Sequence, residues 1–197
     1  RTVIVPVFNN GHHLRHRAFA SLRRAASFAH MHVLLIDDGS TDGVTAAIVD
    51  ELTRLHPNVS AFHHAPGGSG SASRPRNTGL DLTATPFVTY LDPDDEQHED
   101  GYGHLMERLQ DTDGADFALG TQITWNADRM VLDVHRWLSP GTEEIDGLQH
   151  PHPGTLRATS FRPASIESMV ARTDWLKGLG LTLSLIHISE PTRRTPI

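Results

Sequence analysis

Short apolar runs alternate with amphipathic stretches along the first part of the chain, a pattern typical of strands followed by helices. The runs that we predict as strands are 2–8, 31–36, 59–62 and 87–91. The apolar stripes that predict helices are Leu14, Ala18, Leu22 and Ala25; Val44, Ala47, Ile48, Leu52 and Leu55; Leu80 and Leu82 in a helix starting near Pro75; and a stretch around 103–110. A succession of strand–helix units predicts an α/β fold with a mostly parallel sheet flanked by helices.

The regular rhythm weakens beyond Asp113, where we predict a small antiparallel lobe. The elements expected there are strands at 116–125, 129–135 and 168–172, a loop-like stretch at 140–153, and a short helix from Thr173. The second part of the chain is therefore predicted to differ in architecture from the first.

Composition narrows the classes of protein that the chain can belong to. Its 197 residues allow one domain, or one domain with a short appendage. The chain contains no cysteine, which excludes a disulfide scaffold and any thiolate zinc site. Its 17 Lys and Arg against 24 Asp and Glu give a net charge of −7, so a strongly basic face for nucleic acid is not expected. No apolar run approaches the roughly 18 residues of a membrane span.

Acidic residues follow two of the predicted strands at the point where each ends. Asp37 and Asp38 close the second strand, and Asp92, Asp94 and Asp95 follow the fourth. The carboxyl ends of parallel strands share the edge of the sheet where ligands bind, so these carboxylates are expected to lie together. Such a cluster needs a cation or hydrogen-bond donors, and hard oxygen ligands suit Mg²⁺ or Mn²⁺. Each acidic turn taken alone also fits helix capping without any ligand.

Four segments carry a specific resemblance to a known family. VIVPVFNN, LLIDDGSTD, RPRNTGL and VTYLDPDD, in this order and spacing, resemble the family 2 glycosyltransferases with the GT-A fold. The resemblance covers roughly 2–112 with specific motifs and extends more weakly to about 182. It implies a nucleotide-sugar-binding half at 1–112 and a partial acceptor-side half at 113–182. It also implies metal-assisted transfer, with Mn²⁺ or Mg²⁺, of a sugar from a nucleotide-diphosphate donor to an acceptor hydroxyl, with inversion.

The resemblance further implies roles for individual residues. Those along the donor are Pro6, Phe8 and Asn9 beside the base and ribose, Asp38 hydrogen-bonded to the base, Arg74 or Arg76 near the base or diphosphate, and Asp92 on the ribose or sugar. Asp94 would be the metal ligand, with Asp95 supporting the site. A metal ion held by Asp94 would stabilise the charge that develops on the leaving diphosphate.

The general base that such a transfer needs is not found at the expected place. The family carries an Asp there, often in a Glu-Asp pair, just beyond the segment that is here 178–181. Upstream carboxylates fit that position poorly; they are Glu143, Glu144, Glu167 and Asp174. Residues 183–197 (LSLIHISEPTRRTPI) resemble a translated sequencing-adapter read-through, so we expect a non-native tail after a fold truncated near 182.

Two alternatives to a transferase stay open. A chain without the base would be a nucleotide-sugar-binding fragment without turnover, whereas a strand running into Asp-x-Asp also fits a phosphohydrolase of the haloacid dehalogenase type. An NAD-dependent oxidoreductase is disfavoured because the glycine fingerprint is missing.

The resemblance sets the expected donor and acceptor, whereas the expected absence of nucleic acid follows from the net charge and the expected location from the lack of cysteine. The partners are a nucleotide-diphosphate sugar donor and a sugar, lipid-linked or polymer acceptor, with no nucleic acid. We expect a cytoplasmic location. The arginines on the first predicted helix leave a peripheral association with the inner face of the membrane open; they are Arg15, Arg17, Arg23 and Arg24.

Overall fold

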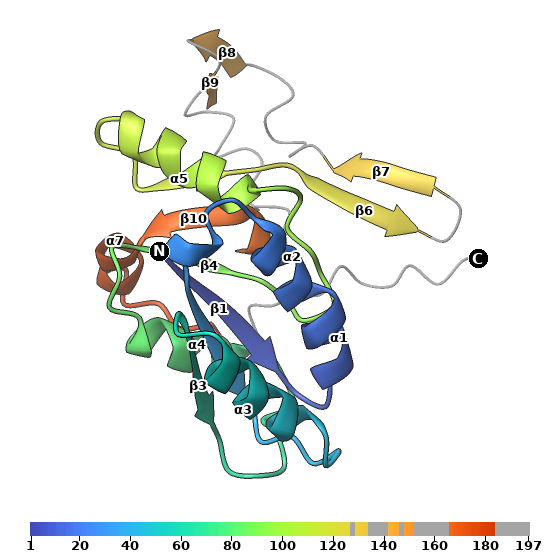
Figure 1. The fold of residues 1–197 in the computed structure, drawn as a ribbon. Helices are drawn as coiled ribbons and strands as arrows, with labels where there is room; N and C mark the ends of the chain where they lie inside the picture. Colours follow the sequence, from blue (N-terminus) through green and yellow to red (C-terminus); the bar gives the residue numbers. More distant parts are fainter. Residues whose placement is uncertain (127–128, 134–141, 146–147, 152–165, 184–197) are drawn as a thin grey trace, which may run out of the picture.

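A six-stranded sheet with the order β3-β2-β1-β4-β10-β5 forms the centre of the molecule (Figure 1). The computed structural model describes residues 1–126, 129–133, 142–145, 148–151 and 166–183. The strands of this sheet are β1 Thr2–Val7, β2 His32–Asp37, β3 Val59–His63, β4 Phe87–Tyr90, β5 Phe117–Leu119 and β10 Met169–Arg172. The first four pair in parallel, and β10 lies antiparallel between β4 and β5. The predicted α/β class with a mostly parallel sheet is confirmed.

Helices cover both faces of this sheet. The described helices are α1 Gly11–His16, α2 Ala18–Arg24, α3 Thr45–Leu55, α4 Ser73–Leu82, α5 Gly101–Asp111 and α7 Thr173–Gly178, with short 3-10 turns η1 Phe28–His30 and η3 Ile166–Ser168. Successive side chains of a strand point to opposite faces. Val3 and Val5 of β1 accordingly pack in one core with α1, α2, α3 and α5, whereas Ile4 packs in a second core with Leu80 of α4 and Leu176 of α7.

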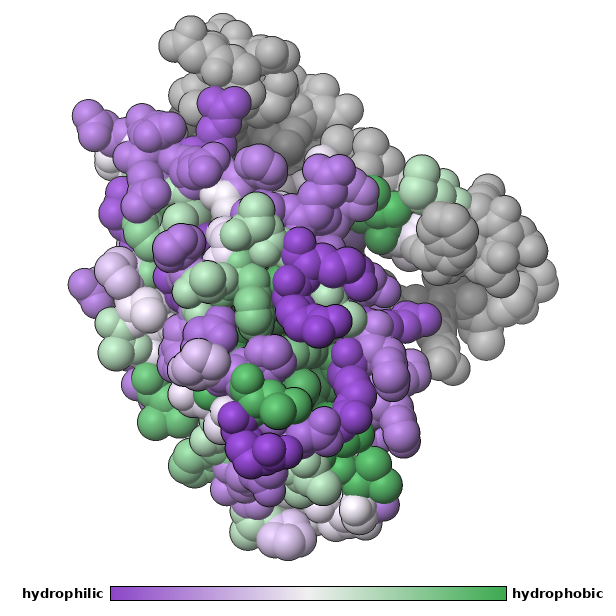
Figure 2. Space-filling model, viewed as in Figure 1, coloured by the Kyte–Doolittle hydropathy of each residue, from purple (hydrophilic) through white to green (hydrophobic). Residues whose placement is uncertain are grey.

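The solvent-facing side of the helices that cover the first core is largely polar. Figure 2 shows the face formed by α1, α2 and α3, on which hydrophilic residues predominate and apolar ones are scattered among them. Single exposed apolar residues of this kind are normal on a folded domain. The apolar stripes of α1, α2 and α3 face the sheet, as the periodicity of the sequence predicts.

The first predicted helix is divided in two at Arg17. Its φ of −114° and ψ of −84° leave the helical region, so α1 ends and α2 begins there. The apolar stripe nevertheless continues across the break, because Leu14, Ala18 and Leu22 are all fully buried. The guanidinium of Arg17 donates a hydrogen bond to the backbone oxygen of Asp94 at 3.0 Å. The break thus places a cation on the loop that follows β4.

Helix α4 approaches the sheet through a glycine. A Cβ atom on Gly79 would lie only 2.4 Å from Cγ2 of Ile4 in β1, so α4 can approach β1 this closely only because residue 79 has no side chain. The prediction that Leu82 lies on the apolar side of the helix is wrong, since 48% of this residue is exposed. The close approach at Gly79 turns Pro75 and Arg76 inward, and both are buried.

The second half of the chain contributes to the main sheet and forms two antiparallel hairpins. The hairpin strands are β6 Gln122–Asn126 with β7 Arg129–Asp133, and β8 Thr142–Ile145 with β9 Leu148–Pro151. The predicted strand 116–125 is therefore two strands, β5 and β6, and the prediction of a loop throughout 140–153 is wrong. The sequence Asp146-Gly147 between β8 and β9 is typical of tight hairpin turns and would have predicted this hairpin.

The division of the chain at 112 and 113 stays a prediction. The main sheet takes β5 and β10 from beyond this position, while β6 to β9 lie outside the sheet. Of the predicted tail, Leu183 is described and 184–197 lie outside the described residues. No helix in the described part of the chain is long and apolar enough to cross a membrane.

Candidate active site at the carboxyl ends of the parallel strands

The predicted site residues meet at the edge of the sheet where β1, β2 and β4 end. A cavity of about 390 Å³ opens at this edge. Five of the predicted site residues line it, namely Pro6, Phe8, Asp38, Asp92 and Asp94. Ligands of open α/β sheets bind at such strand ends, because the loops leaving neighbouring strands diverge there. The structure therefore brings together residues that are up to 88 positions apart (94 − 6) in the sequence.

Asn9 is a predicted site residue that does not line this cavity. Its backbone lies in the left-handed region with a φ of 51°. The side-chain oxygen accepts hydrogen bonds from the N–H groups of Thr41 and Asp42, and its own N–H donates to the hydroxyl of Ser40. Asn9 thus fastens the loop after β1 to the loop after β2. Its neighbour Asn10 lines the cavity instead.

Asp38 is held by two partners from the segment that follows β3. Its side chain is 3% exposed, and Nε of Arg74 lies 2.7 Å from Oδ1. The N–H and the hydroxyl of Ser69 both donate to Oδ2, at 2.7 and 2.6 Å. Burial alone would raise the pKa of Asp38, but the hydrogen bonds from Ser69 and Arg74 outweigh burial and hold the pKa below its ordinary value. Asp38 is therefore an ionised acceptor at the cavity wall.

Glycines allow the segment that carries Ser69 to pack closely on the site. Gly39 has a φ of +81°, and a Cβ there would lie 2.0 Å from the backbone oxygen of Ala65. Gly68 has a φ of +70°, and a Cβ there would lie 2.6 Å from the ring of Phe8. Only glycine adopts both this backbone conformation and this approach without strain. The Gly-rich segment thus has a defined conformation and forms part of the cavity wall.

Arg76 joins two carboxylates behind the cavity. Its Nη2 lies 2.6 Å from Oδ1 of Asp92 and 2.6 Å from Oε1 of Glu167. The side chains of Arg76 and Glu167 are only 10% and 15% exposed, whereas that of Asp92 is 31% exposed. Burial, followed by repulsion from Asp92, raises the pKa of Glu167 to about 7, against the opposing charge of Arg76. Arg74 and Arg76 are thus each paired with a carboxylate of the site.

Glu167 is the residue of this site that the sequence analysis missed as a site residue. It lies in η3, directly before β10, and reaches the site because β10 returns antiparallel beside β4. No motif or spacing in the sequence marks this return. The nearest signal is the short apolar run that predicts a strand at 168–172.

The acidic loop after β4 offers oxygen ligands for a cation. One oxygen each from Asp92, Asp95 and Glu167 lie within 4.8 Å of one another. Burial, then the charges of Asp94 and Asp92, raise the pKa of Asp95, while Arg17 and Arg76 oppose this shift. Carboxylate oxygens fit Mg²⁺ or Mn²⁺ in their chemistry. Arg76 binds one oxygen of Asp92 and one oxygen of Glu167, and Asp94 lies outside this group of three carboxylates.

Asp94 differs from its neighbours in this loop. It is exposed and lines the cavity. Among the residues that the structure describes, its carboxylate has no hydrogen-bond or ion-pair partner, and only its backbone oxygen is bound, by Arg17. This arrangement suits a ligand-binding carboxylate better than a helix cap, since a capping carboxylate would accept backbone N–H groups.

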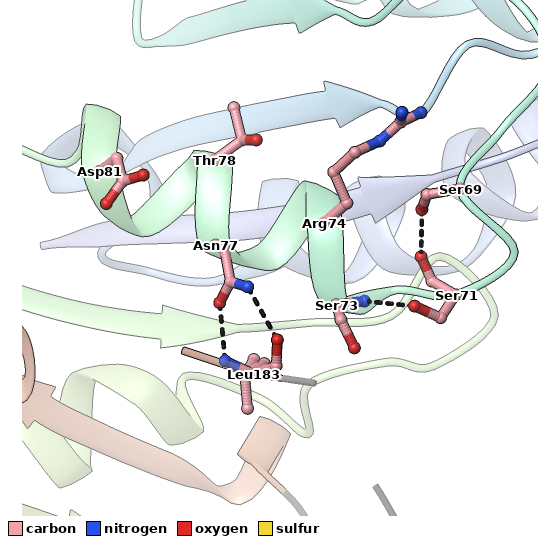
Figure 3. A pocket seen from close by; sticks show the side chains of 8 residues that line it. All are labelled: Ser69, Ser71, Ser73, Arg74, Asn77, Thr78, Asp81 and Leu183. Atoms are coloured by element: carbon pink, nitrogen blue, oxygen red, sulfur yellow. Dashed lines mark hydrogen bonds between the residues drawn. The ribbon is translucent and has the colours of Figure 1, made fainter. Parts of the chain in front are cut away.

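A second cavity of about 370 Å³ lies along α4 and shares Ser71 with the first. Figure 3 shows that Asn77 and Arg74, which both line this cavity, leave α4 in different directions. Asn77 points to Leu183, whereas the guanidinium of Arg74 reaches Asp38. The side-chain amide of Asn77 donates to the backbone oxygen of Leu183 and accepts from its N–H, both at 2.9 Å. Asn77 of the RPRNTGL motif thus binds the backbone of Leu183, the first residue of the predicted non-native tail.

An open, mostly parallel α/β sheet with a cavity and carboxylate–arginine pairs at its strand ends has the architecture of a ligand-binding α/β protein. The chain belongs to the family "Glycosyl transferase family 2", whose model matches residues 2–165. The structure is similar to that of TarS 1–349 from S. aureus in complex with UDP-GlcNAc, with a TM-score of 0.67 and 22% identity. That likeness covers 93% of this chain and 48% of the other, and it confirms the predicted fold.

Two curated relatives each match about half of this chain. The chain is 34% identical over 99 residues to poly(ribitol-phosphate) beta-N-acetylglucosaminyltransferase TarP of Staphylococcus aureus, which covers 50% of this chain and 29% of the relative. It is 39% identical over 93 residues to the pre-mycofactocin glycosyltransferase of Mycobacterium tuberculosis, which covers 47% of this chain and 17% of the relative. The chain thus spans less than a third of the length of either relative.

Proposed function

We propose that this chain binds a nucleotide-diphosphate sugar and transfers the sugar, with inversion, to an acceptor hydroxyl. The observation that carries the proposal is the shared cavity of Asp38 and Asp94 in a chain of glycosyl transferase family 2. An ionised acceptor buried at one end and an unpaired carboxylate at the other suit a ligand with a hydrogen-bonding base and a metal-bound diphosphate.

The base and ribose would lie against the β1 end of the cavity. Pro6 and Phe8 supply apolar wall, and Asp38 accepts a hydrogen bond from the base. Asn9 supports this end by fastening the neighbouring loop. TarS has been crystallised with UDP and with UDP-GlcNAc, and so we propose a uridine diphosphate sugar as the donor.

Asp94 would hold Mn²⁺ or Mg²⁺, with Asp95 beside it. A structural neighbour, a mannosyltransferase from Pyrobaculum calidifontis, is described in complex with GDP-Man and Mn²⁺. When bound, such an ion neutralises the charge on the leaving diphosphate. Asp92 and Glu167 are paired with Arg76 and not with the ion. Oδ2 of Asp92, which Arg76 does not contact, would accept hydrogen bonds from the ribose or sugar. The same division of charges disfavours a phosphohydrolase, whose nucleophilic carboxylate would not be tied to an arginine.

Inversion requires one displacement by an acceptor hydroxyl whose proton passes to a general base. We assign no residue to that role. The acceptor that we propose is a sugar, a lipid-linked sugar or a polymer, in line with the names of TarP and of a Campylobacter jejuni relative that acts on an undecaprenol-linked glycan. Nucleic acid is not among the proposed partners.

We propose a cytoplasmic location, with contact to the inner face of the membrane as the open alternative. Two of the four arginines named for that contact are paired within the protein, Arg15 with Glu51 and Arg24 with Glu96. Arg17 contacts the loop after β4. The positive charge available to an anionic lipid surface is therefore reduced.

Calorimetric titration of UDP and UDP-GlcNAc, with and without Mn²⁺, tests the proposal. We expect Mn²⁺-dependent binding that Asp94→Ala abolishes. Binding that is unchanged by Asp94→Ala would overturn the metal assignment, and no binding of any nucleoside diphosphate would overturn the proposed function. Release of UDP from a bound donor separates a transferase from a fragment that only binds.

A further inference from the structure

Glu167 stands behind the donor site and does not line it. The cavity wall contains Asp92 but neither Arg76 nor Glu167. The same nitrogen of Arg76, Nη2, contacts both carboxylates, each at 2.6 Å. These residues come from the end of β4, from α4 and from η3, so the contact joins elements that are distant in the sequence.

We propose that Glu167 is a positioning residue that holds Arg76 against Asp92 and so fixes the Asp92 carboxylate at the cavity wall. The inference rests on the proposed function, because it concerns the same donor site. Glu167 would contact neither the donor nor the acceptor. Its effect on the donor would pass through Arg76.

The backbone that follows Glu167 is anchored to β4 and to the end of β5, as a positioning role requires. The N–H of Gly120, which follows β5, donates to the backbone oxygen of Ser168 at 2.7 Å. The hydroxyl of Thr89 in β4 donates to the backbone oxygen of Met169, also at 2.7 Å. The residues that follow Glu167 are therefore fixed to the strand that carries Asp92 and to the strand on the other side of β10.

A buried arginine with two acceptors has a defined orientation, whereas one acceptor leaves the guanidinium free to pivot. Charge-assisted hydrogen bonds of this length are strong, and they fix geometry as well as charge. Removal of Glu167 would leave Arg76, which is 8% exposed, with Asp92 as its remaining carboxylate partner on Nη2. The pair would then settle into a new geometry, and the Asp92 oxygen that faces the donor would move with it.

The test compares Glu167→Ala, which removes the acceptor, with Glu167→Gln, which keeps an oxygen at the same place. Glu107→Ala is the matched control, because Glu107 lies on α5 with a side chain that is 69% exposed. Affinity for UDP-GlcNAc with Mn²⁺ is measured by calorimetry on the full chain. We expect Glu167→Ala to weaken binding about tenfold, Glu167→Gln to restore most of it, and Glu107→Ala to change nothing.

A double-mutant cycle separates positioning from a merely structural role. In an Arg76→Met background, Glu167→Ala should cause no further loss of affinity, because its effect passes through Arg76. Equal losses with and without Arg76, or wild-type affinity in Glu167→Ala, would overturn the inference.

A ligand-independent measurement keeps the inference distinct from the proposed function. The guanidinium ¹⁵N resonances of Arg76 should show hindered rotation in the wild-type chain and faster rotation in Glu167→Ala. Unchanged rotation would overturn the positioning role even if the donor binds. A wild-type chain that binds no donor would overturn the proposed function, and the rotation of Arg76 would still decide whether Glu167 holds it.

Discussion

Nε of Arg74 lies 2.7 Å from Oδ1 of Asp38, so the arginine and the carboxylate that were assigned separately to a nucleotide are partners of each other. Arg74 also donates to the backbone oxygen of Asp38 at 3.2 Å. The pair spans 36 residues of sequence, and of its two members Asp38 lines the cavity. The contact that we propose between Asp38 and a base therefore concerns a carboxylate that is already held in an ion pair.

The first prediction concerns Asp38. Asp38→Ala should weaken UDP binding about tenfold or more, because a buried, ionised acceptor is lost. The Mn²⁺ requirement should persist, since Asp94 is untouched. Calorimetry at constant Mn²⁺ measures the change, and Asp50→Ala, whose side chain is 74% exposed, is the control. Wild-type affinity in Asp38→Ala would contradict the assigned contact to the base.

The second prediction concerns the turn after β2. Gly39→Ala should lower the free energy of unfolding by about 2–4 kcal/mol, because the new Cβ meets a backbone oxygen and the positive φ adds strain. Gly43 has a similar φ of +73° but open space around it, so Gly43→Ala should cost only about 1 kcal/mol. Urea unfolding of the two variants measures the difference. Equal losses would show that the contact with Ala65 contributes nothing.

The third prediction concerns the contact between α4 and β1. Gly79→Ala should destabilise the protein by about 1–3 kcal/mol, since the added methyl group overpacks Ile4. Gly101, at the start of α5, has nothing within 4 Å of a Cβ position, so Gly101→Ala should stay within about 0.5 kcal/mol of the wild type. Thermal unfolding monitored by circular dichroism distinguishes the two, and a neutral Gly79→Ala would mean that α4 can shift without cost.

The fourth prediction concerns pH. The pKa of Glu167 is raised to about 7 by burial and by Asp92, whereas an unfolded glutamate titrates near about 4.3. Between these values the folded protein keeps a proton that the unfolded chain releases, so the free energy of unfolding falls as pH rises through this window. Glu167→Gln should flatten that fall, because the amide does not titrate.

Urea unfolding at several pH values between 5 and 8 measures this effect. The difference between wild type and Glu167→Gln isolates Glu167 from Asp95, whose pKa is raised as well. Parallel pH profiles in the two proteins would mean that Glu167 titrates at its ordinary pKa.

The sequence predicted the four parallel strands because each is a short apolar run. It also predicted the cavity residues that lie at or just after the ends of those runs, namely Pro6, Phe8, Asp38, Asp92 and Asp94. The pairing of Arg74 with Asp38 and of Arg76 with Asp92 was not predictable, since it depends on how α4 lies across the sheet. That placement is decided by the contact of Gly79 with Ile4, which has no periodic signature. Glu167 was missed for a related reason, because strand order is a property of the sheet and not of any local segment.

The insertion of β10 between β4 and β5 also sets the order in which the molecule is completed. Ala171 pairs with Val88 on one side and with Phe117 on the other, so β5 joins the sheet only through a strand that is synthesised later. Contacts between residues so distant in the sequence form late, because the entropy of closing the loop is lost before the contact contributes any stabilising free energy. A growing chain can therefore pair β1, β2 and β4, whose ends form the cavity, well before Glu167 reaches Arg76 and Asp92. We expect the proposed donor site to be complete only after β10, which ends at Arg172, has been synthesised.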